Sequence, residues 1–452
     1  MTVLHIVTHA IFPVAGGLEA ALLRIARGLS QSPGFKVVVY IQRSSSEYML
    51  DDPAHFPLEV VHLARQKSFL MEPLQASPNE PSENVPNPSS YARESFRIDY
   101  LLLVAAVKAR IDHDPDARHL IISFFATNSG FVAQQVSLTL GVPHMASIRG
   151  SDFSRDFRSP RHCEAIRFAV ENARLVVTTN HEQARTLAAA FPSSGPFRTI
   201  HNAVENVPSE MWTPSPSDVV RLVADCEFTF KKGTHILLRA VGELLSEGQP
   251  VSLTLAGRVE PTQRSYWDES KRQYAARFPG AFSFHDWMPA ERVTAMILSS
   301  HVYTSATLGE GCSNGLARAM TLGIPIVTTR CGALPDAGGS ASHVRMCAPS
   351  DLDAFVAELR SMVANIRGGK LAVDQDQIRE WRQYFATERE RTEWRQAVNE
   401  ALELRNLARP ATLRGISGVC DPSPAESMPR TSSEGSKPLP VAMLNFPGPD
   451  PR

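Results

Sequence analysis

The sequence predicts an α/β protein with two Rossmann-like, doubly wound parallel-sheet domains that face a central cleft. Short runs of β-branched apolar residues alternate with amphipathic helical stretches along most of the chain, a pattern typical of parallel βαβ units. The alternation is interrupted at residues 206–218, which hold several Pro and Ser residues and are typical of a linker. We therefore expect an N-terminal domain over residues 1–205 and a second domain over residues 219–375.

The composition is that of an ordinary globular protein and excludes several classes of function. The 452 residues carry a formal net charge of −1, so no basic excess points to nucleic acid. The six cysteines include no C-x-x-C pair, which argues against a disulfide or metal framework and fits a reducing compartment. No apolar run reaches the roughly 18 residues of a spanning helix, and no signal peptide is evident. We expect a cytoplasmic protein.

In the N-terminal domain, the first strand is expected at residues 3–8 and the first helix from Leu18. Gly16 and Gly17 lie between them and would let backbone approach a ligand at the helix start, although a simple tight turn explains them equally well. The dinucleotide fingerprint G-x-G-x-x-G is absent. Residues 66–98 are rich in Pro, Ser and Asn and predict a mobile insertion. Further strands are expected at 37–41, 59–63, 119–125, 143–148 and 176–179, and helices at 101–111, 130–140 and 182–190.

The second domain repeats the alternation and is followed by helices. Its strands are expected at 219–224, 251–256, 282–284, 302–305 and 324–329, and its helices at 234–245, 290–298, 315–322 and 351–363. Residues 376–407 predict one or two C-terminal helices. Residues 408–452 lack periodicity and are expected to be a disordered tail.

Residues 308–336 form the most informative stretch of the sequence. A strand ends in Gly309-Glu310-Gly311, and Ser313 and Asn314 are good N-cap residues for the helix that follows. The N-terminus of this helix favours a phosphate, and the Glu310 carboxylate would accept hydrogen bonds from sugar hydroxyls. Phosphate and sugar together indicate a nucleotide-sugar ligand.

This stretch resembles the donor-site signature of the retaining glycosyltransferases of the group-1 (family 4) type, which have the two-lobed GT-B fold. The matching residues are Glu310, Gly311, Asn314, Leu316, Ala319, Met320, Gly323, Pro325 and Val327. Arg318 departs from the signature, because the family has a second acid there. The resemblance implies transfer of a hexose from a nucleotide-diphosphate sugar to a glycan, lipid-linked or small-molecule acceptor, with retention of the anomeric configuration. It also implies that no metal or other cofactor is needed, and that the last helix crosses back onto the N-terminal domain. Trp381, Phe385 and Trp394 are its candidate anchors.

A second donor-site segment is Lys231-Lys232-Gly233, which precedes an amphipathic helix. A lysine beside a glycine at the start of a helix can neutralise a departing diphosphate. The alternative without a function is a basic turn exposed to solvent. The family usually has an arginine five residues before its lysine, where this chain has Glu227. We therefore hypothesise that Arg318 supplies the missing charge, with Glu227 paired to it or to ribose hydroxyls. The alternative is a site that has lost its activity.

Across the cleft, Arg149 occupies a position where related enzymes often have histidine, and it is followed closely by Asp152. Arginine is not a base near neutral pH, so we expect Arg149 to hold a donor phosphate or an anionic acceptor, or else to form a surface salt bridge with Asp152 or Asp156. Asn202 stands in the turn that closes the N-terminal domain in the family. The basic residues within 155–167 have two possible interpretations. They form a helix face exposed to solvent, or they contact the inner face of the membrane peripherally.

These observations define a set of candidate site residues. The catalytic candidates are Glu310, Lys232 and Arg318; the donor-binding candidates are Gly16, Gly17, Glu227, Gly311, Ser313, Asn314, Gly315 and Leu316; the acceptor-side candidates are Arg149, Asp152 and Asn202. Two rival functions remain, a non-catalytic nucleotide-sugar-binding partner protein and a sugar-nucleotide epimerase on the same fold.

Overall fold

The computed structural model describes residues 1–9, 17–42, 58–63, 88–213, 217–338 and 341–404. Gly16, residues 66–87 of the expected insertion and the expected tail at 408–452 lie outside the described residues. No described helix combines the length and the apolar character that crossing a membrane requires.

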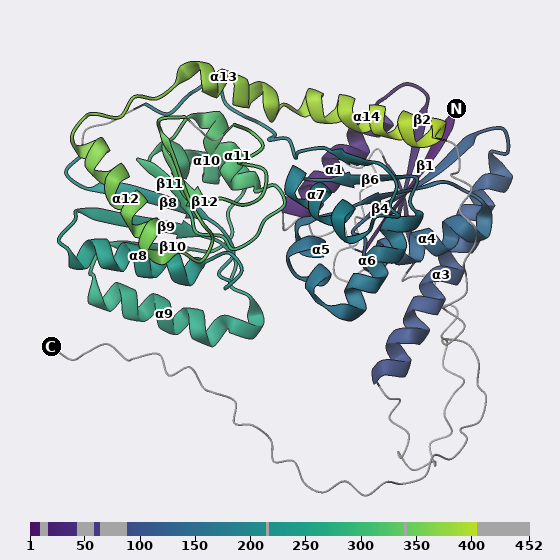
Figure 1. The fold of residues 1–452 in the computed structure, drawn as a ribbon, viewed down its shortest axis with the longest axis horizontal. Helices are drawn as coiled ribbons and strands as arrows, with labels where there is room; N and C mark the ends of the chain where they lie inside the picture. Colours follow the sequence, from purple (N-terminus) through teal and green to yellow (C-terminus); the bar gives the residue numbers. More distant parts are fainter. Residues whose placement is uncertain (10–16, 43–57, 64–87, 214–216, 339–340, 405–452) are drawn as a thin grey trace, which may run out of the picture. The chain divides into compact units, whose positions relative to one another are not determined.

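The first lobe contains a seven-stranded sheet in the order β3-β2-β1-β4-β5-β6-β7, and all of its paired strands are parallel (Figure 1). The strands are β1 Thr2–Thr8, β2 Phe35–Ile41, β3 Glu59–His62, β4 Arg118–Phe124, β5 His144–Ser147, β6 Leu175–Thr178 and β7 Phe197–Thr199. The helices are α1 Gly17–Ser30, α3 Pro88–His113, α4 Asn128–Leu140, α5 Gly150–Ser154, the 3-10 turn η2 Asp156–Arg158, α6 Pro160–Asn172 and α7 His181–Ala190.

Burial on both faces explains why these strands are almost continuously apolar. Along β1, Leu4 and Ile6 pack with residues of α1 and α14, whereas Val3 and Val7 pack with residues of α3 and α4 on the opposite face. Successive side chains of a strand point to opposite faces, so a strand covered on both sides needs apolar residues at consecutive positions.

The second lobe contains a six-stranded sheet in the order β10-β9-β8-β11-β12-β13, again with parallel pairing. Its strands are β8 Val220–Asp225, β9 Val251–Ala256, β10 Phe282–His285, β11 Val302–Ser305, β12 Ile326–Thr329 and β13 Val344–Cys347. Its helices are α8 Thr234–Ser246, the 3-10 turn η3 Pro261–Gln263, α9 Arg264–Arg277, α10 Ala290–Leu298, α11 Asn314–Leu322 and α12 Leu352–Arg367. Leu222 packs with α8 and α12, whereas its neighbour Val223 packs with α10 and α11 on the other face.

Two helices follow the second lobe: α13 Gln375–Tyr384 and α14 Thr387–Glu403. Trp394 of α14 lies in the core of the first lobe and stacks on Phe124, with ring centroids 5.5 Å apart. Trp381 and Phe385 instead pack in the core of the second lobe. Three aromatic anchors were expected on the first lobe, and of these only Trp394 lies there. The reason is that α13 packs on the second lobe, so the chain crosses to the first lobe between α13 and α14.

Residues 88–98 differ from the expected mobile insertion, because α3 begins at Pro88. Proline suits the first turn of a helix, whose N–H groups have no partner within the helix. The sequence analysis also missed α9 and β13. Trp267 is the buried residue of α9, so the helix has too narrow an apolar face to show a period. In β13, Arg345 interrupts the apolar run.

Candidate functional site

The loop between β11 and α11 carries the candidate donor residues Glu310 and Gly311. The helix begins as expected: the Ser313 hydroxyl accepts a hydrogen bond from the Leu316 N–H at 3.4 Å, and Gly323 ends the helix with φ 77°. A short polar side chain at the N-cap and a left-handed glycine at the C-terminus are the signals on which the prediction rested.

A second loop, between β8 and α8, presses against this one. Gly233 caps α8 with φ 66°, and a Cβ atom there would lie 1.8 Å from the carbonyl oxygen of Ala306. The Leu308 N–H donates to the carbonyl of Lys231 at 2.9 Å. Only glycine allows both the left-handed backbone and this close approach, so Gly233 fixes how the loops before α8 and α11 meet.

The contact between these loops brings Lys232 and Glu310 together. The Lys232 Nζ atom lies 2.5 Å from Glu310 Oε1, and the two side chains are 23% and 13% exposed. Burial alone lowers the pKa of the Lys232 ammonium, but the Glu310 carboxylate outweighs burial and raises that pKa above its usual value. The lysine is therefore a fixed positive charge held against a carboxylate.

Asp225, which the sequence analysis did not single out, also lies in this region. The Tyr303 hydroxyl donates to Asp225 Oδ1 at 2.6 Å. A Cβ atom on Gly315 would lie 1.9 Å from the same oxygen, so the carboxylate sits beside the first turn of α11. Burial raises the pKa of Asp225 to about 6, although the Tyr303 hydrogen bond and the charges of Arg318 and Lys232 oppose the shift. Its position at the carboxyl end of a parallel strand was the signal that could have found it.

Arg318, the residue of the charge-exchange hypothesis, makes its side-chain hydrogen bond to α10. Its Nη1 donates to the Thr294 hydroxyl of α10 at 3.0 Å, and its side chain is buried. Burial lowers the pKa of this guanidinium. Glu227 is exposed, and within the described ranges no ion pair joins it to Arg318. The proposed pairing of these two residues is therefore absent from this conformation.

Arg149, on the first lobe, is a buried cation that forms no ion pair with a carboxylate of the described residues. It is 4% exposed, its Cζ lies 4.5 Å from the centroid of the Phe124 ring, and its Nη1 donates to Asn202 Oδ1 at 3.3 Å. Its Nε and Nη2 atoms have no hydrogen-bond partner. Burial lowers the pKa of Arg149 to about 10. The expected surface salt bridge with Asp152 or Asp156 is thus wrong, because the guanidinium turns inward.

Asp152 has a different role from the other acceptor-side candidates. It is fully buried, and its carboxylate accepts hydrogen bonds from the backbone N–H groups of Arg149 at 2.9 Å and Ala126 at 3.2 Å. Burial raises the pKa of Asp152 to about 6. In this conformation the residue holds the start of α5 in place and has no surface for an acceptor.

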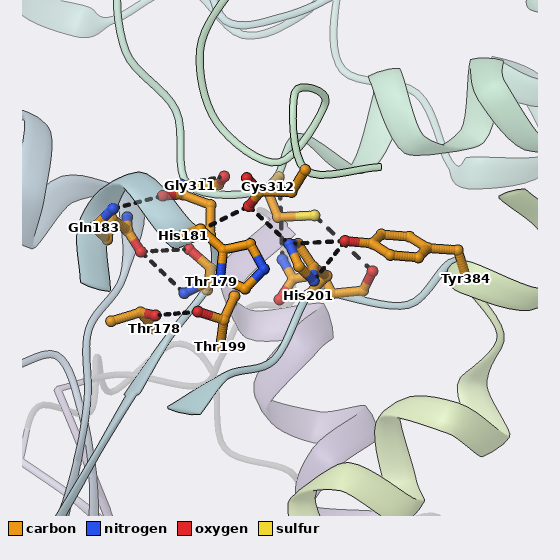
Figure 2. A network of polar contacts seen from close by, with 12 residues as sticks. Thr178, Thr179, His181, Gln183, Thr199, His201, Gly311, Cys312 and Tyr384 are labelled. Atoms are coloured by element: carbon orange, nitrogen blue, oxygen red, sulfur yellow. Dashed lines mark hydrogen bonds and ion pairs between the residues drawn. The ribbon is translucent and has the colours of Figure 1, made fainter. Parts of the chain in front are cut away.

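Several candidates from the two lobes meet at the start of α11. Asn202 Nδ2 donates to the Cys312 carbonyl at 3.4 Å, and Asn314 Nδ2 donates to the Gly17 carbonyl at 3.3 Å. Asn180, whose role the sequence analysis missed, donates to the Gly311 carbonyl at 2.8 Å. Figure 2 shows Gly311 and Cys312 lying against Thr179, Gln183 and His201 of the first lobe. The structure therefore gathers Arg149, Asn202, Asn314 and Gly17, and places Arg318 and Asp152 outside this group.

Comparison with known proteins agrees with this architecture. Residues 220–365 match the family model described as Glycosyl transferases group 1. Sucrose-phosphate synthase from Thermosynechococcus elongatus aligns with a TM-score of 0.67 at 15% identity, covering 88% of this chain and 98% of that chain. HepE from Anabaena, solved in complex with UDP, aligns with a TM-score of 0.61 at 16% identity, covering 89% of this chain and 99% of that chain. The lipopolysaccharide outer core galactosyltransferase WaaB in its apo form aligns with a TM-score of 0.62 at 14% identity, covering 88% of this chain and 99% of that chain.

A sequence comparison with curated proteins gives no match. Residues 220–365 in the second lobe thus match the group 1 glycosyltransferase model, and the two parallel-sheet α/β domains have the GT-B fold.

Proposed function

We propose that the chain transfers a hexose from a nucleotide-diphosphate sugar to a glycan, lipid-linked or small-molecule acceptor, with retention of the anomeric configuration. The observation that carries the proposal is the Lys232–Glu310 contact of 2.5 Å, formed where the loops before α8 and α11 meet. It places a fixed cation and a carboxylate side by side, which are the two groups that a diphosphate-linked sugar needs.

On the donor side, Lys232 stabilises the negative charge that develops on the departing diphosphate. Glu310 then accepts hydrogen bonds from hydroxyls of the transferred sugar. HepE has been solved with UDP, with UDP and glucose, and with UDP-glucose, which supports a donor of this class for a chain of the same fold. Gly17, Gly311, Ser313 and Asn314 would surround the donor at the ends of α1 and α11.

On the acceptor side, Arg149 supplies two nitrogen atoms, Nε and Nη2, that have no hydrogen-bond partner among the described residues. Buried charged groups are normally paired, so the free donors indicate an anionic group on the bound substrates. That group is a donor phosphate or an acid on the acceptor. A lipid-linked acceptor would bring the protein to the inner membrane surface as a peripheral enzyme.

No described side chain needs to act as a base in this reaction. The departing phosphate oxygen takes the proton of the acceptor hydroxyl on the same face of the sugar, so that one bond forms as the other breaks. Closure of the lobes excludes water, which would otherwise hydrolyse the donor. The chemistry requires no metal ion.

The test is an assay of the full chain with a panel of nucleotide-sugars and acceptors. We expect donor-dependent formation of a glycosylated product, with the same anomeric configuration as the donor when examined by NMR. Nucleotide release in the absence of acceptor, without any glycosylated product, indicates hydrolysis alone. A product with inverted anomeric configuration contradicts the proposed mechanism.

One rival function has support from the structure. Asp225 places a carboxylate beside the first turn of α11, and Arg318 is directed at Thr294 rather than at the loop. Both features weaken stabilisation of the departing diphosphate during transfer and fit a nucleotide-sugar-binding partner protein without catalysis. A tight donor complex with no turnover on any acceptor would favour this rival.

A further inference from the structure

Three potential metal ligands meet at a place that the proposed reaction does not use. His181 begins α7, His201 follows β7, and Asp336 lies between β12 and β13 in the second lobe. One ligand atom of each residue lies within 4.8 Å of the others, and His201 Nε2 is 3.0 Å from Asp336 Oδ2. Figure 2 shows the His181 and His201 rings beside each other, next to the donor loop at Cys312.

The surroundings orient two of these side chains. The Tyr384 hydroxyl lies 2.9 Å from His201 Nδ1 and 3.0 Å from His201 Nε2, and Asp336 Oδ2 accepts a hydrogen bond from the His181 backbone N–H at 2.7 Å. His201 is buried, Asp336 is partly buried, and His181 is exposed. An exposed imidazole can turn toward an ion at little cost, while the other two ligands are already held.

We propose that His181, His201 and Asp336 bind a divalent transition-metal ion, with zinc as the prototype. Imidazole nitrogen with carboxylate oxygen is a common ligand set for zinc, whereas magnesium prefers oxygen ligands. Tetrahedral zinc with bonds of about 2.0–2.1 Å needs ligand atoms about 3.3–3.5 Å apart, so a small rotation of His181 closes the site. His201 binds through Nε2, its Nδ1–H donates to the Tyr384 oxygen, and the fourth position is open to water.

The ion joins the two lobes and is separate from the chemistry of transfer. His181 and His201 belong to the first lobe and Asp336 to the second, so metal binding cross-links them. Lys232 and Glu310 are not among the ligands. The site is therefore structural or regulatory, and its existence does not depend on the proposed transferase activity.

The test uses the full chain after removal of metal with a chelator. We expect calorimetry with zinc to show one bound equivalent, cobalt to give the visible absorption of a tetrahedral site, and magnesium to give neither. Zinc is also expected to raise the unfolding temperature, because an ion that binds only the folded state stabilises it. His181→Gln should abolish the cobalt spectrum, and Tyr384→Phe should weaken zinc binding by about 10–100-fold through loss of the outer hydrogen bond.

His113→Gln is the matched control, because His113 is an exposed histidine at the end of α3. It should bind zinc as the unaltered chain does. Since His181 is exposed, its replacement should leave the metal-free unfolding temperature unchanged, so loss of binding cannot be attributed to misfolding. Absence of zinc and cobalt binding in the unaltered chain, or unchanged binding in His181→Gln, would overturn the proposal.

Discussion

The Lys232 ammonium lies 2.5 Å from a carboxylate oxygen of Glu310, although 78 positions separate the two residues in the chain. The contact exists because Gly233 lets the loop before α8 approach the carbonyl of Ala306. The position of the Lys232 charge is thus set by the glycine that follows it in the chain.

Replacing Lys232 with Met tests this charge directly. We expect turnover to fall by about 100–1000-fold, the usual loss when one group that stabilises developing charge is removed. Lys231→Met makes the same change one residue earlier and should reduce turnover less than tenfold, since Lys231 contacts the loop before α11 through hydrogen bonds to its backbone carbonyl. Initial rates with a saturating donor measure turnover in both variants. An equal loss of turnover in the two would contradict the assignment of Lys232 as the cation that stabilises the diphosphate.

Asp225 predicts a pH dependence of donor binding. Its pKa is raised to about 6, so the carboxylate is charged at pH 7.5 and repels a diphosphate beside α11. As the pH falls through 6 the group becomes neutral, and nucleotide-sugar affinity should rise. Asp225→Asn should bind about tenfold more tightly at pH 7.5, in line with one screened charge near the ligand, and should lose this pH dependence.

Calorimetric titrations at pH 5.5 and 7.5 measure the effect. Asp353→Asn is the control, because Asp353 is an exposed acid in the first turn of α12. It should leave the donor affinity unchanged at both pH values. Weaker binding by Asp225→Asn would mean instead that the carboxylate contacts ligand hydroxyls.

The elements near the donor site were predictable because their signals are local. The helix expected at residues 290–298 and the strand expected at 302–305 coincide with α10 and β11. The Ser313 cap and the Gly323 stop also follow from a few adjacent residues. By contrast, the approach of Asp225 to Gly315, and the turn of Arg318 toward Thr294, depend on how β8, α10 and α11 pack. No local sequence pattern carries that information.

Alanine substitution at Gly233 tests whether the close approach of the two loops requires glycine there. Gly233→Ala adds a methyl group 1.8 Å from the Ala306 carbonyl at a residue with φ 66°. Gly248→Ala places the same residue at φ 76°, with no atom within 4 Å. The second variant should lose about 1 kcal/mol in free energy of unfolding, from backbone strain alone. The first should lose about 3 kcal/mol or more, since the two donor loops must separate.

Denaturant unfolding of both variants gives the comparison. Donor turnover adds a second readout, because separation of the loops would also part Lys232 from Glu310. Equal destabilisation would show that the two loops adjust freely and that Gly233 does not position the lysine.

Arg149 predicts opposite effects on stability and on function. Its guanidinium is buried and forms no ion pair within the part of the chain that the structure describes, and burial lowers its pKa to about 10, so the charged form is destabilised by folding. Arg149→Met keeps the apolar packing on Phe124 and removes the charge, so the free energy of unfolding should stay the same or rise by about 1–2 kcal/mol. If Arg149 holds an anionic group of the substrates, KM should rise at least tenfold in the same variant. Arg155→Met, whose side chain is 74% exposed and paired with Asp156, removes a charge at the surface and should change KM little. A variant at Arg149 that is both less stable and fully active would show that the guanidinium serves the fold and not the substrates.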